Sequence, residues 1–311
     1  MLKLLLAMCC VLVVACSETS APPLRIGTNL WPGFEPLYLA RELGYLDKHK
    51  IRLVEYTSTS QVIKAYRSGL LDAAAVTLDV AISMQASGEH MQIVLVLDVS
   101  DGADVLLGQP ELKSIQDIAG KRVGIEHSAL GTYFIHRTLE VSGIDKASVT
   151  IVPYEPHNHE RVFNAKEVDA LVTFDPVRSR LLANGAVLLF DSQQLPGEIV
   201  DVLIVRKDIV KSAAEHIEHL KEAWFKAIDR FKNNPQNFTD ILNKRMKLGE
   251  ENVLTAFQGM TFPGRLQNQS LLNNNEKNNL QKTSREMATS MYESQIISVP
   301  VDTQQLFRKS N

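Results

Sequence analysis

The body of this chain lacks cysteine. All three cysteines of the 311 residues, Cys9, Cys10 and Cys16, lie within the first sixteen positions. A disulfide framework, a cysteine nucleophile and a thiolate metal site are therefore excluded beyond residue 16. Such a body cannot mispair thiols in an oxidising compartment.

An excess of positive charge is also missing. The chain has 33 Lys and Arg against 36 Asp and Glu, a formal net charge of −3. A nucleic-acid-binding protein needs a basic face. We therefore expect no nucleic-acid partner.

No apolar run is long enough to cross a membrane. The longest, residues 4–15, follows Lys3 and is far shorter than the roughly 20 residues that a membrane-spanning helix needs. It ends in Val-Val-Ala-Cys16, which resembles a bacterial lipobox. We predict a lipoprotein signal peptide over 1–16, an acylated Cys16, a tether over 17–23 and a place in the bacterial cell envelope facing the periplasm. An ordinary cleaved signal peptide with a chance cysteine is the alternative.

Catalytic motifs are absent as well. The chain has no Gly-x-Ser-x-Gly, no His-Glu-x-x-His and no phosphate-binding loop. His157 and His159, with Glu155 and Glu160, could ligate zinc, but the prolines beside them favour a solvated connection. We expect no enzyme activity, no cofactor and no metal.

What is present is a regular alternation of strands and helices. We predict strands over 24–27, 51–56, 73–77, 93–98 and 104–107, and helices over 36–42, 60–68 and 80–86. This order gives mostly parallel sheets covered by helices. Further along the chain, we predict a strand over 199–206 and an amphipathic helix over 213–231, with Trp224 in the core.

Part of the pattern recurs 97 residues later. Arg25 and Gly27 match Arg122 and Gly124, and Asp72 matches Asp169. The segment 76–79 is echoed at 172–175. We predict two similar α/β lobes, and a chance match of short motifs is the alternative.

Several segments resemble one family, the solute-binding proteins of nitrate, sulfonate and taurine transport, which also includes binders of thiamine-pyrimidine precursors. The resemblance covers roughly residues 24–306, and its segments are 24–28, 37–45, 68–74, 115–124, 168–176, 186–191 and 262–271. It implies the type II periplasmic-binding fold, with lobe one over 24–106 plus 200–311 and lobe two over 107–199. It also implies a monomer that binds a small solute between its lobes and docks on an inner-membrane ABC permease. A membrane sensor as the partner is the alternative.

Ligand contacts are expected where strands end and helices begin at the interlobe cleft. Aromatic rings in the loop 29–35 could stack on a solute, and hydroxyls with a helix N-terminus at 128–133 could hold an anion. The predicted ligand residues are Trp31, Phe34, Asp79, Asp101, Ser128, Gly131, Thr132 and Asp175. Most of these residues also have a purely structural alternative. The aromatic rings could serve only as hydrophobic packing, and Asp101 could simply be solvated. Helix capping is the alternative for Asp79, Ser128, Thr132 and Asp175.

The predicted solute is small, polar and organic. The carboxylates expected near the cleft, Asp79, Asp175 and the group at 98–104, disfavour a bare dianion. A zwitterion or an amino-substituted heteroaromatic fits better, with any anionic end at 128–132. We therefore expect a sulfonate- or taurine-like or an amino-pyrimidine-like solute.

Overall fold

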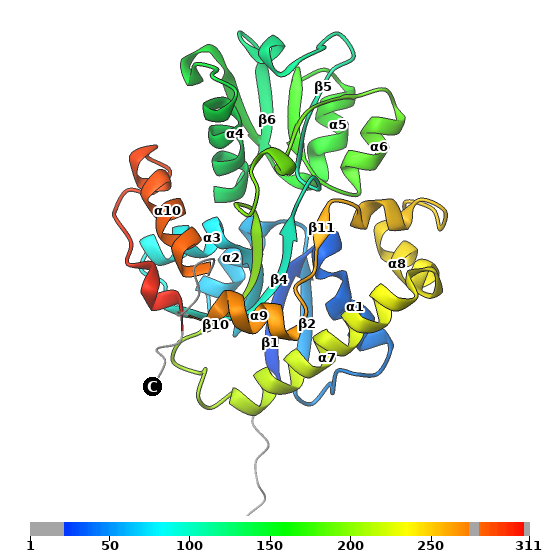
Figure 1. The fold of residues 1–311 in the computed structure, drawn as a ribbon, viewed down its shortest axis with the longest axis vertical. Coiled ribbons are helices and arrows are strands. Elements are labelled where there is room, and N and C mark those ends of the chain that lie inside the picture. Colours follow the sequence, from blue (N-terminus) through cyan, green and yellow to red (C-terminus); the bar gives the residue numbers. More distant parts are fainter. Residues whose placement is uncertain (1–21, 274–279, 308–311) are drawn as a thin grey trace, which may run out of the picture.

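A computed structural model describes residues 22–273 and 280–307. Its strands form two separate sheets, each flanked by helices and placed one beyond the other along the long axis (Figure 1). This confirms the predicted two-lobed α/β architecture. The predicted signal peptide, the acylated Cys16 and most of the tether lie outside the described residues.

The first sheet has six strands in the order β11-β4-β10-β3-β1-β2. Their bounds are β1 (Leu24–Asn29), β2 (Ile51–Tyr56), β3 (Ala73–Thr77), β4 (Met91–Ser100), β10 (Val200–Arg206) and β11 (Met260–Thr261). The second sheet has five strands in the order β7-β6-β8-β5-β9. They are β5 (Val105–Gly108), β6 (Arg122–Glu126), β7 (Thr150–Tyr154), β8 (Ala170–Thr173) and β9 (Val187–Asp191).

Both sheets are mixed, but most strands of each run in one direction, as expected: β1, β2, β3 and β4 in the first sheet and β6, β7, β8 and β9 in the second. In the first, β1 pairs in parallel with β2 and β3, but β10 runs antiparallel to β3 and β4. In the second, β5 runs antiparallel to β8 and β9. The cause is the path of the chain, which leaves the first sheet after β4 and returns through β10 between two strands already in place.

Helices cover both faces of each sheet. The α-helices are α1 (Glu35–Glu42), α2 (Thr59–Arg67), α3 (Leu78–Ala86), α4 (Ala129–Val141), α5 (His159–Asn164), α6 (Val177–Ala183), α7 (Ala214–Asn233), α8 (Thr239–Met246), α9 (Arg265–Leu272) and α10 (Leu280–Glu293). The 3-10 helices are η1 (Pro32–Phe34), η2 (Ile115–Ile118), η3 (Lys146–Ser148), η4 (Pro156–Asn158), η5 (Ser192–Gln194), η6 (Pro235–Phe238), η7 (Val253–Phe257) and η8 (Thr303–Leu306).

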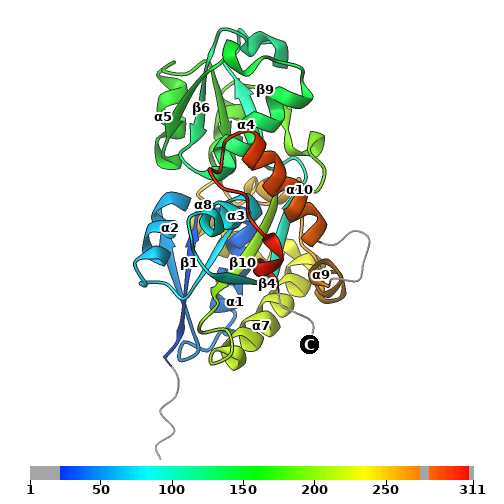
Figure 2. The same cartoon turned by 90° about the vertical axis from the view of Figure 1, so that its left-hand side faces the viewer.

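The period of two along a strand decides which helix each residue meets. In β3, Ala74 and Val76 pack into the cluster that contains α2, α3 and α10, whereas Ala73 and Ala75 pack into the cluster that contains α1 and α7. Trp224 of α7 is fully buried there, as predicted. Helix α10 packs on α3, and α3 in turn contacts α4 of the second lobe (Figure 2).

The predicted internal repeat is confirmed by matching hydrogen bonds. The Arg25 guanidinium bonds both carboxylate oxygens of Asp72 (2.7 Å each) and the Gly69 carbonyl (3.0 Å). The Arg122 guanidinium bonds both oxygens of Asp169 (3.1 Å each) and the Lys166 carbonyl (2.9 Å). Each pair ties the start of one strand to the start of the strand beside it, so the two lobes share one local design.

Two crossovers join the sheets. The first lies between Ser100 and Val105, ahead of the predicted boundary after residue 106, because β5 belongs wholly to the second sheet. The second lies between Asp191 and Val200. They are joined at Ser192, whose hydroxyl accepts from the Gly102 amide (2.6 Å) and bonds the Ser100 hydroxyl (2.8 Å).

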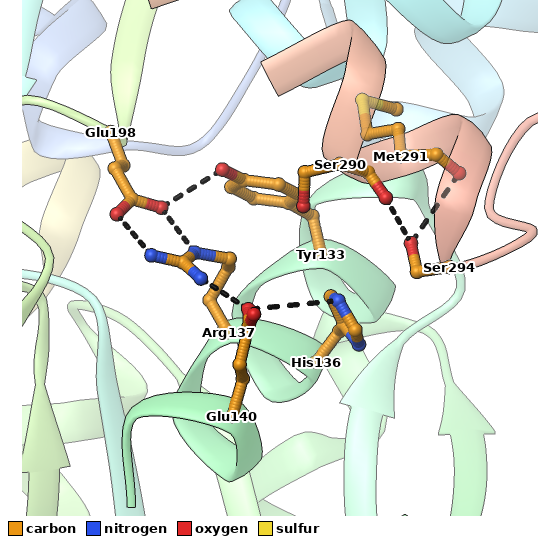
Figure 3. A network of polar contacts seen from close by, with 8 residues as sticks. All are labelled: Tyr133, His136, Arg137, Glu140, Glu198, Ser290, Met291 and Ser294. Atoms are coloured by element: carbon orange, nitrogen blue, oxygen red, sulfur yellow. Dashed lines mark hydrogen bonds and ion pairs between the residues drawn. The ribbon is translucent and has the colours of Figure 1, made fainter. Parts of the chain in front are cut away.

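The second crossover is also fixed to α4 (Figure 3). The Glu198 carboxylate accepts from the Tyr133 hydroxyl and from two nitrogens of Arg137, each at 2.8 Å. Burial raises the pKa of Glu198, but the bonds from Arg137 and Tyr133 outweigh burial, so the pKa lies below its ordinary value. Glu198 of the second crossover is therefore ionised at neutral pH, and its carboxylate is held by two side chains of the second lobe.

Candidate functional site

A pocket of about 330 Å³, including its mouth, lies between the two lobes. The lining residues come from the ends of strands and the starts of helices in both lobes. They are Asn29, Trp31, Phe34, Thr59, Val76, Thr77, Asp104, Glu126, Leu130, Phe174 and Asp201.

Two aromatic rings from opposite lobes meet in this pocket. Trp31 follows β1 in the first lobe and Phe174 follows β8 in the second, with ring centroids 5.4 Å apart and planes at 87°. Trp31 is 5% exposed, and its indole nitrogen lies 3.4 Å from Asp98 Oδ2. The residue at 33 must be glycine for this arrangement, since a Cβ there would lie 2.0 Å from Asp98 Oδ2 and 2.2 Å from the indole nitrogen.

Of the predicted ligand residues, Trp31 and Phe34 line the pocket. Phe174 was missed, although it immediately precedes the predicted Asp175. The signal that could have found it is the internal repeat, which aligns the turn after β8 with the turn after β3.

Asp79 is not the N-cap of α3 that its capping alternative required. The helix begins at Leu78 with Thr77 as the N-cap residue, so Asp79 lies inside the first turn. Its side chain is 1% exposed, and neither carboxylate oxygen has a hydrogen-bond partner among the described residues. The Thr77 hydroxyl lies near it but outside hydrogen-bonding geometry. Burial, with the nearby charges of Asp104 and Glu126, raises the pKa of Asp79 to about 7.

Three more buried carboxyl groups stand around the same point. Asp98 of β4 and Asp201 of β10 are direct cross-strand neighbours, and Asp104 follows on the first crossover. Burial raises the pKa of Asp98 and of Asp104 to about 7. Burial and the charge of Asp98 also raise the pKa of Asp201 well above its ordinary value, because two neighbouring carboxyl groups cannot easily both ionise.

A fifth carboxyl group reaches the pocket from the second lobe. Glu126 ends β6, and its Oε1 accepts from the Thr59 amide at the start of α2 (3.3 Å), while its Oε2 accepts from the Ser128 hydroxyl (3.0 Å). Burial raises the pKa of Glu126 as well. Its bond to Thr59 crosses from one lobe to the other.

The predicted anion cradle at 128–132 is engaged in local bonds. Ser128 caps α4 by accepting from the Gly131 amide (3.2 Å), and the Thr132 hydroxyl donates to the Ser128 carbonyl (3.1 Å). A Cβ at Gly131 would lie 2.3 Å from the Glu126 carbonyl oxygen, which explains the glycine. From this segment the pocket receives Leu130.

The two remaining predicted acids differ sharply in position. Asp175 is buried, accepts from the Ser179 amide (3.1 Å) and lies 3.5 Å from the Arg178 guanidinium. Asp101 is exposed at the first crossover and is absent from the pocket lining, whereas Asp104 lines it. The sequence marked both as members of one acidic run, but not which of them faces inward.

The histidines considered as zinc ligands have other contacts. His159 is buried beside the Thr173 hydroxyl (3.1 Å), while His157 lies on the surface next to Asn158. Within residues 22–273 and 280–307, no group of three or more His, Cys, Asp or Glu side chains is arranged to hold a metal ion. In the same part of the chain no helix is both long and apolar enough to span a membrane.

Two sheets joined by two crossovers, with a pocket between them, define the architecture of periplasmic solute-binding proteins. The chain belongs to the NMT1-like family, whose model matches residues 17–243. A relative from Brucella abortus (strain 2308), named as a binding protein, is 25% identical over 241 residues, 75% of this chain and 74% of the relative.

Solved structures share the whole fold. The periplasmic aliphatic sulphonate binding protein SsuA from Escherichia coli superposes with a TM-score of 0.76 at 21% identity, covering 93% of this chain and 98% of that one. The ligand binding component of an ABC-type import system from Staphylococcus aureus gives a TM-score of 0.76 at 14% identity, covering 93% and 97%. At these identities the likeness establishes the fold.

Proposed function

We propose that this protein captures a small polar organic solute in the interlobe pocket and delivers it to an ABC importer of the inner membrane. The observation that carries the proposal is that both lobes line one pocket and meet across it, through Trp31 with Phe174 and through Glu126 with Thr59. Only a ligand that contacts both lobes can shift the balance between open and closed forms. The E. coli and S. aureus structures, named for sulphonate binding and for import, support this output.

The protein acts on the outer side of the inner membrane, tied to a membrane by lipid on Cys16. This part rests on the sequence pattern of residues 1–23 and on the periplasmic E. coli protein of the same fold. A lipid anchor keeps the pocket near its permease. The solute is sulfonate- or taurine-like or amino-pyrimidine-like, and the protein binds it without catalysis.

The two tryptophans of the chain allow a direct binding test. Trp31 lines the pocket and Trp224 is buried in the core of the first lobe. In a Trp224→Phe variant, Trp31 is the sole indole reporter. We expect a saturable change in its fluorescence with at least one of ethanesulfonate, taurine and 4-amino-5-hydroxymethyl-2-methylpyrimidine.

The Trp31→Phe variant is the matched control, since it keeps a ring in the pocket and the reporter in the core. Its fluorescence should change little at the same ligand concentrations. If no compound of these three classes changed either the fluorescence or the melting temperature, the proposed solute-binding role would be wrong.

A further inference from the structure

The pocket carries far more negative than positive side chains. Asp104, Glu126 and Asp201 line it, and Asp98 lies directly opposite Asp201 on the neighbouring strand. The charge of Asp104 raises the pKa values of Asp79, Asp98 and Asp201, and its own pKa is raised by the charge of Glu126. All five carboxyl groups are at least nine-tenths buried. The cation that offsets Asp104 is Arg178, which is also the ion-pair partner of Asp175.

Some polar atoms in and beside these carboxyl groups have no hydrogen-bond partner among the described residues. Both oxygens of Asp79 and one oxygen of Asp98 have no hydrogen-bond partner among the described residues. The Thr77 hydroxyl, which lines the pocket and is 7% exposed, has none either. Buried polar groups are normally hydrogen-bonded, and leaving one unpaired is unfavourable. These groups are therefore poised to receive hydrogen bonds from a molecule that enters.

The helix starts beside the pocket, where an anion could bind, are engaged by one of the protein's own carboxylates. The amide at the start of α2 and the Ser128 hydroxyl at the start of α4 both donate to Glu126. Arg178 forms an ion pair with Asp175 at 3.5 Å, its Nη1 has no hydrogen-bond partner among the described residues, and it is not part of the pocket lining. A sulfonate in this pocket would displace an internal anion and stand among the remaining ones. Coulomb repulsion in a buried site makes that unfavourable.

We propose that the solute carries a protonated nitrogen, an ammonium or amidinium group, which donates hydrogen bonds into the Asp79–Asp98–Asp104–Asp201 cluster while its apolar part contacts Trp31. This inference rests on the proposed solute-binding function and names the charge of its ligand. The solute is then an organic cation or an amino-substituted heteroaromatic that binds in its protonated form, and bare sulfonates are excluded.

Three probes of one shape but different charge test the inference: benzylamine as a cation, benzyl alcohol as a neutral molecule and benzenesulfonate as an anion. Binding is followed by Trp31 fluorescence in the Trp224→Phe chain. We expect benzylamine to bind at least tenfold more tightly than benzyl alcohol, and benzenesulfonate more weakly than both. Benzylamine affinity should rise between pH 6 and 8, as the cluster loses protons.

The groups that titrate or carry charge around this site are Asp79, Asp98, Asp104, Glu126, Asp175, Arg178 and Asp201, with Tyr133 close enough to interact with Asp79 and Glu155 with Glu126. Asp104→Asn should weaken the binding of benzylamine at least tenfold and reduce the dependence of its affinity on pH. The control Asp101→Asn, three positions away but exposed, should leave both unchanged. If Asp104→Asn does not fold, Asp201→Asn provides a second variant of an acid that lines the pocket.

The two hypotheses fail in different ways. Tighter binding of benzenesulfonate than of benzylamine, or an equal effect of Asp101→Asn and Asp104→Asn, would overturn the cationic ligand and leave the solute-binding function in place. A pocket that binds none of the three probes, nor the sulfonates and pyrimidine of the earlier test, would overturn both.

Discussion

Single residues in the pocket are arranged for binding at the expense of stability. Asp79 is buried with neither oxygen hydrogen-bonded, and Asp98 and Asp201 are buried carboxyl groups on directly opposed strand positions that cannot easily both ionise. Both arrangements are unfavourable in the empty protein. We interpret them as a site whose missing partner is supplied by the solute.

Replacement of Asp79 by Asn should make the empty protein more stable at neutral pH. The unfolded pKa of Asp is about 3.9, and burial raises the folded pKa to about 7. The folded state therefore holds the proton more tightly, and the stability due to Asp79 is lost as pH rises from about 4 to 7. The stability difference between Asp79→Asn and wild type should grow in this window by up to about 1.4 kcal/mol per pH unit.

Urea unfolding at pH 5, 6, 7 and 8 measures this difference. Burial lowers the pKa of His159 to about 4, and its effect on stability cancels in the comparison because both proteins contain it. The exposed Asp101→Asn is the control and should track wild type throughout. A stability difference that does not change with pH would show that Asp79 is not a buried, raised-pKa carboxyl group.

At the scale of elements, each lobe begins with the same strand-to-strand clamp. Arg25 with Asp72 and Arg122 with Asp169 make matching sets of hydrogen bonds, and in both clamps the acid also accepts from the arginine's own backbone amide at 2.9 Å. The side-chain exposures are 18% for Asp72 and 31% for Asp169. Because Asp169 is more exposed, water competes more strongly for the hydrogen bonds between Arg122 and Asp169.

Both Asp72→Asn and Asp169→Asn should destabilise the protein by about 1–2 kcal/mol, with the larger loss at Asp72 because hydrogen bonds to less exposed charged groups contribute more. Chemical denaturation at pH 7 measures the free energies of unfolding. Asp240→Asn, which breaks the exposed Asp240–Lys244 pair of α8, is the matched control and should cost at most about 0.5 kcal/mol. Losses no larger than the control's would mean that the clamps do not contribute to stability.

At the scale of the whole molecule, two crossovers connect the lobes, and their contacts set how the lobes can move. Ser192 joins the first crossover to the second, and Glu198 joins the second crossover to α4. The second lobe and the crossover that enters the first sheet are thereby linked as one unit.

Glu198→Gln should destabilise the protein at pH 7 by about 1–3 kcal/mol, because a partly buried carboxylate loses its charge-assisted bonds to Arg137. The folded pKa of Glu198 is lowered, so its contribution is present above the unfolded value of about 4.3 and is lost as pH falls through the folded pKa. The loss of stability caused by Glu198→Gln should therefore become smaller below about pH 4.3.

Denaturation curves at pH 7 and pH 3.5 test this. Tyr133→Phe, which removes one of the three bonds to Glu198 and no charge, should cost less than Glu198→Gln at pH 7. If Glu198→Gln lost the same free energy of unfolding at both pH values, the charge of Glu198 would not stabilise the crossover.

Local pattern alone determined much of this protein. The thiol-free body, the bounds of strands such as β2 and β3, and the Arg–Asp repeat all follow from residue type and spacing, because these features depend on near neighbours. The aromatic residues of the loop after β1 also identified one wall of the pocket.

Only the tertiary structure decided which acids form the pocket. Asp98 and Asp201 become neighbours through antiparallel pairing of strands far apart in the sequence, and Glu126 arrives from the other lobe. Asp101 and Asp104 look alike in the sequence, yet one is exposed and the other buried. Strand register and the path of the crossover fix these positions. The charge of the site was therefore set by contacts that local sequence patterns do not specify.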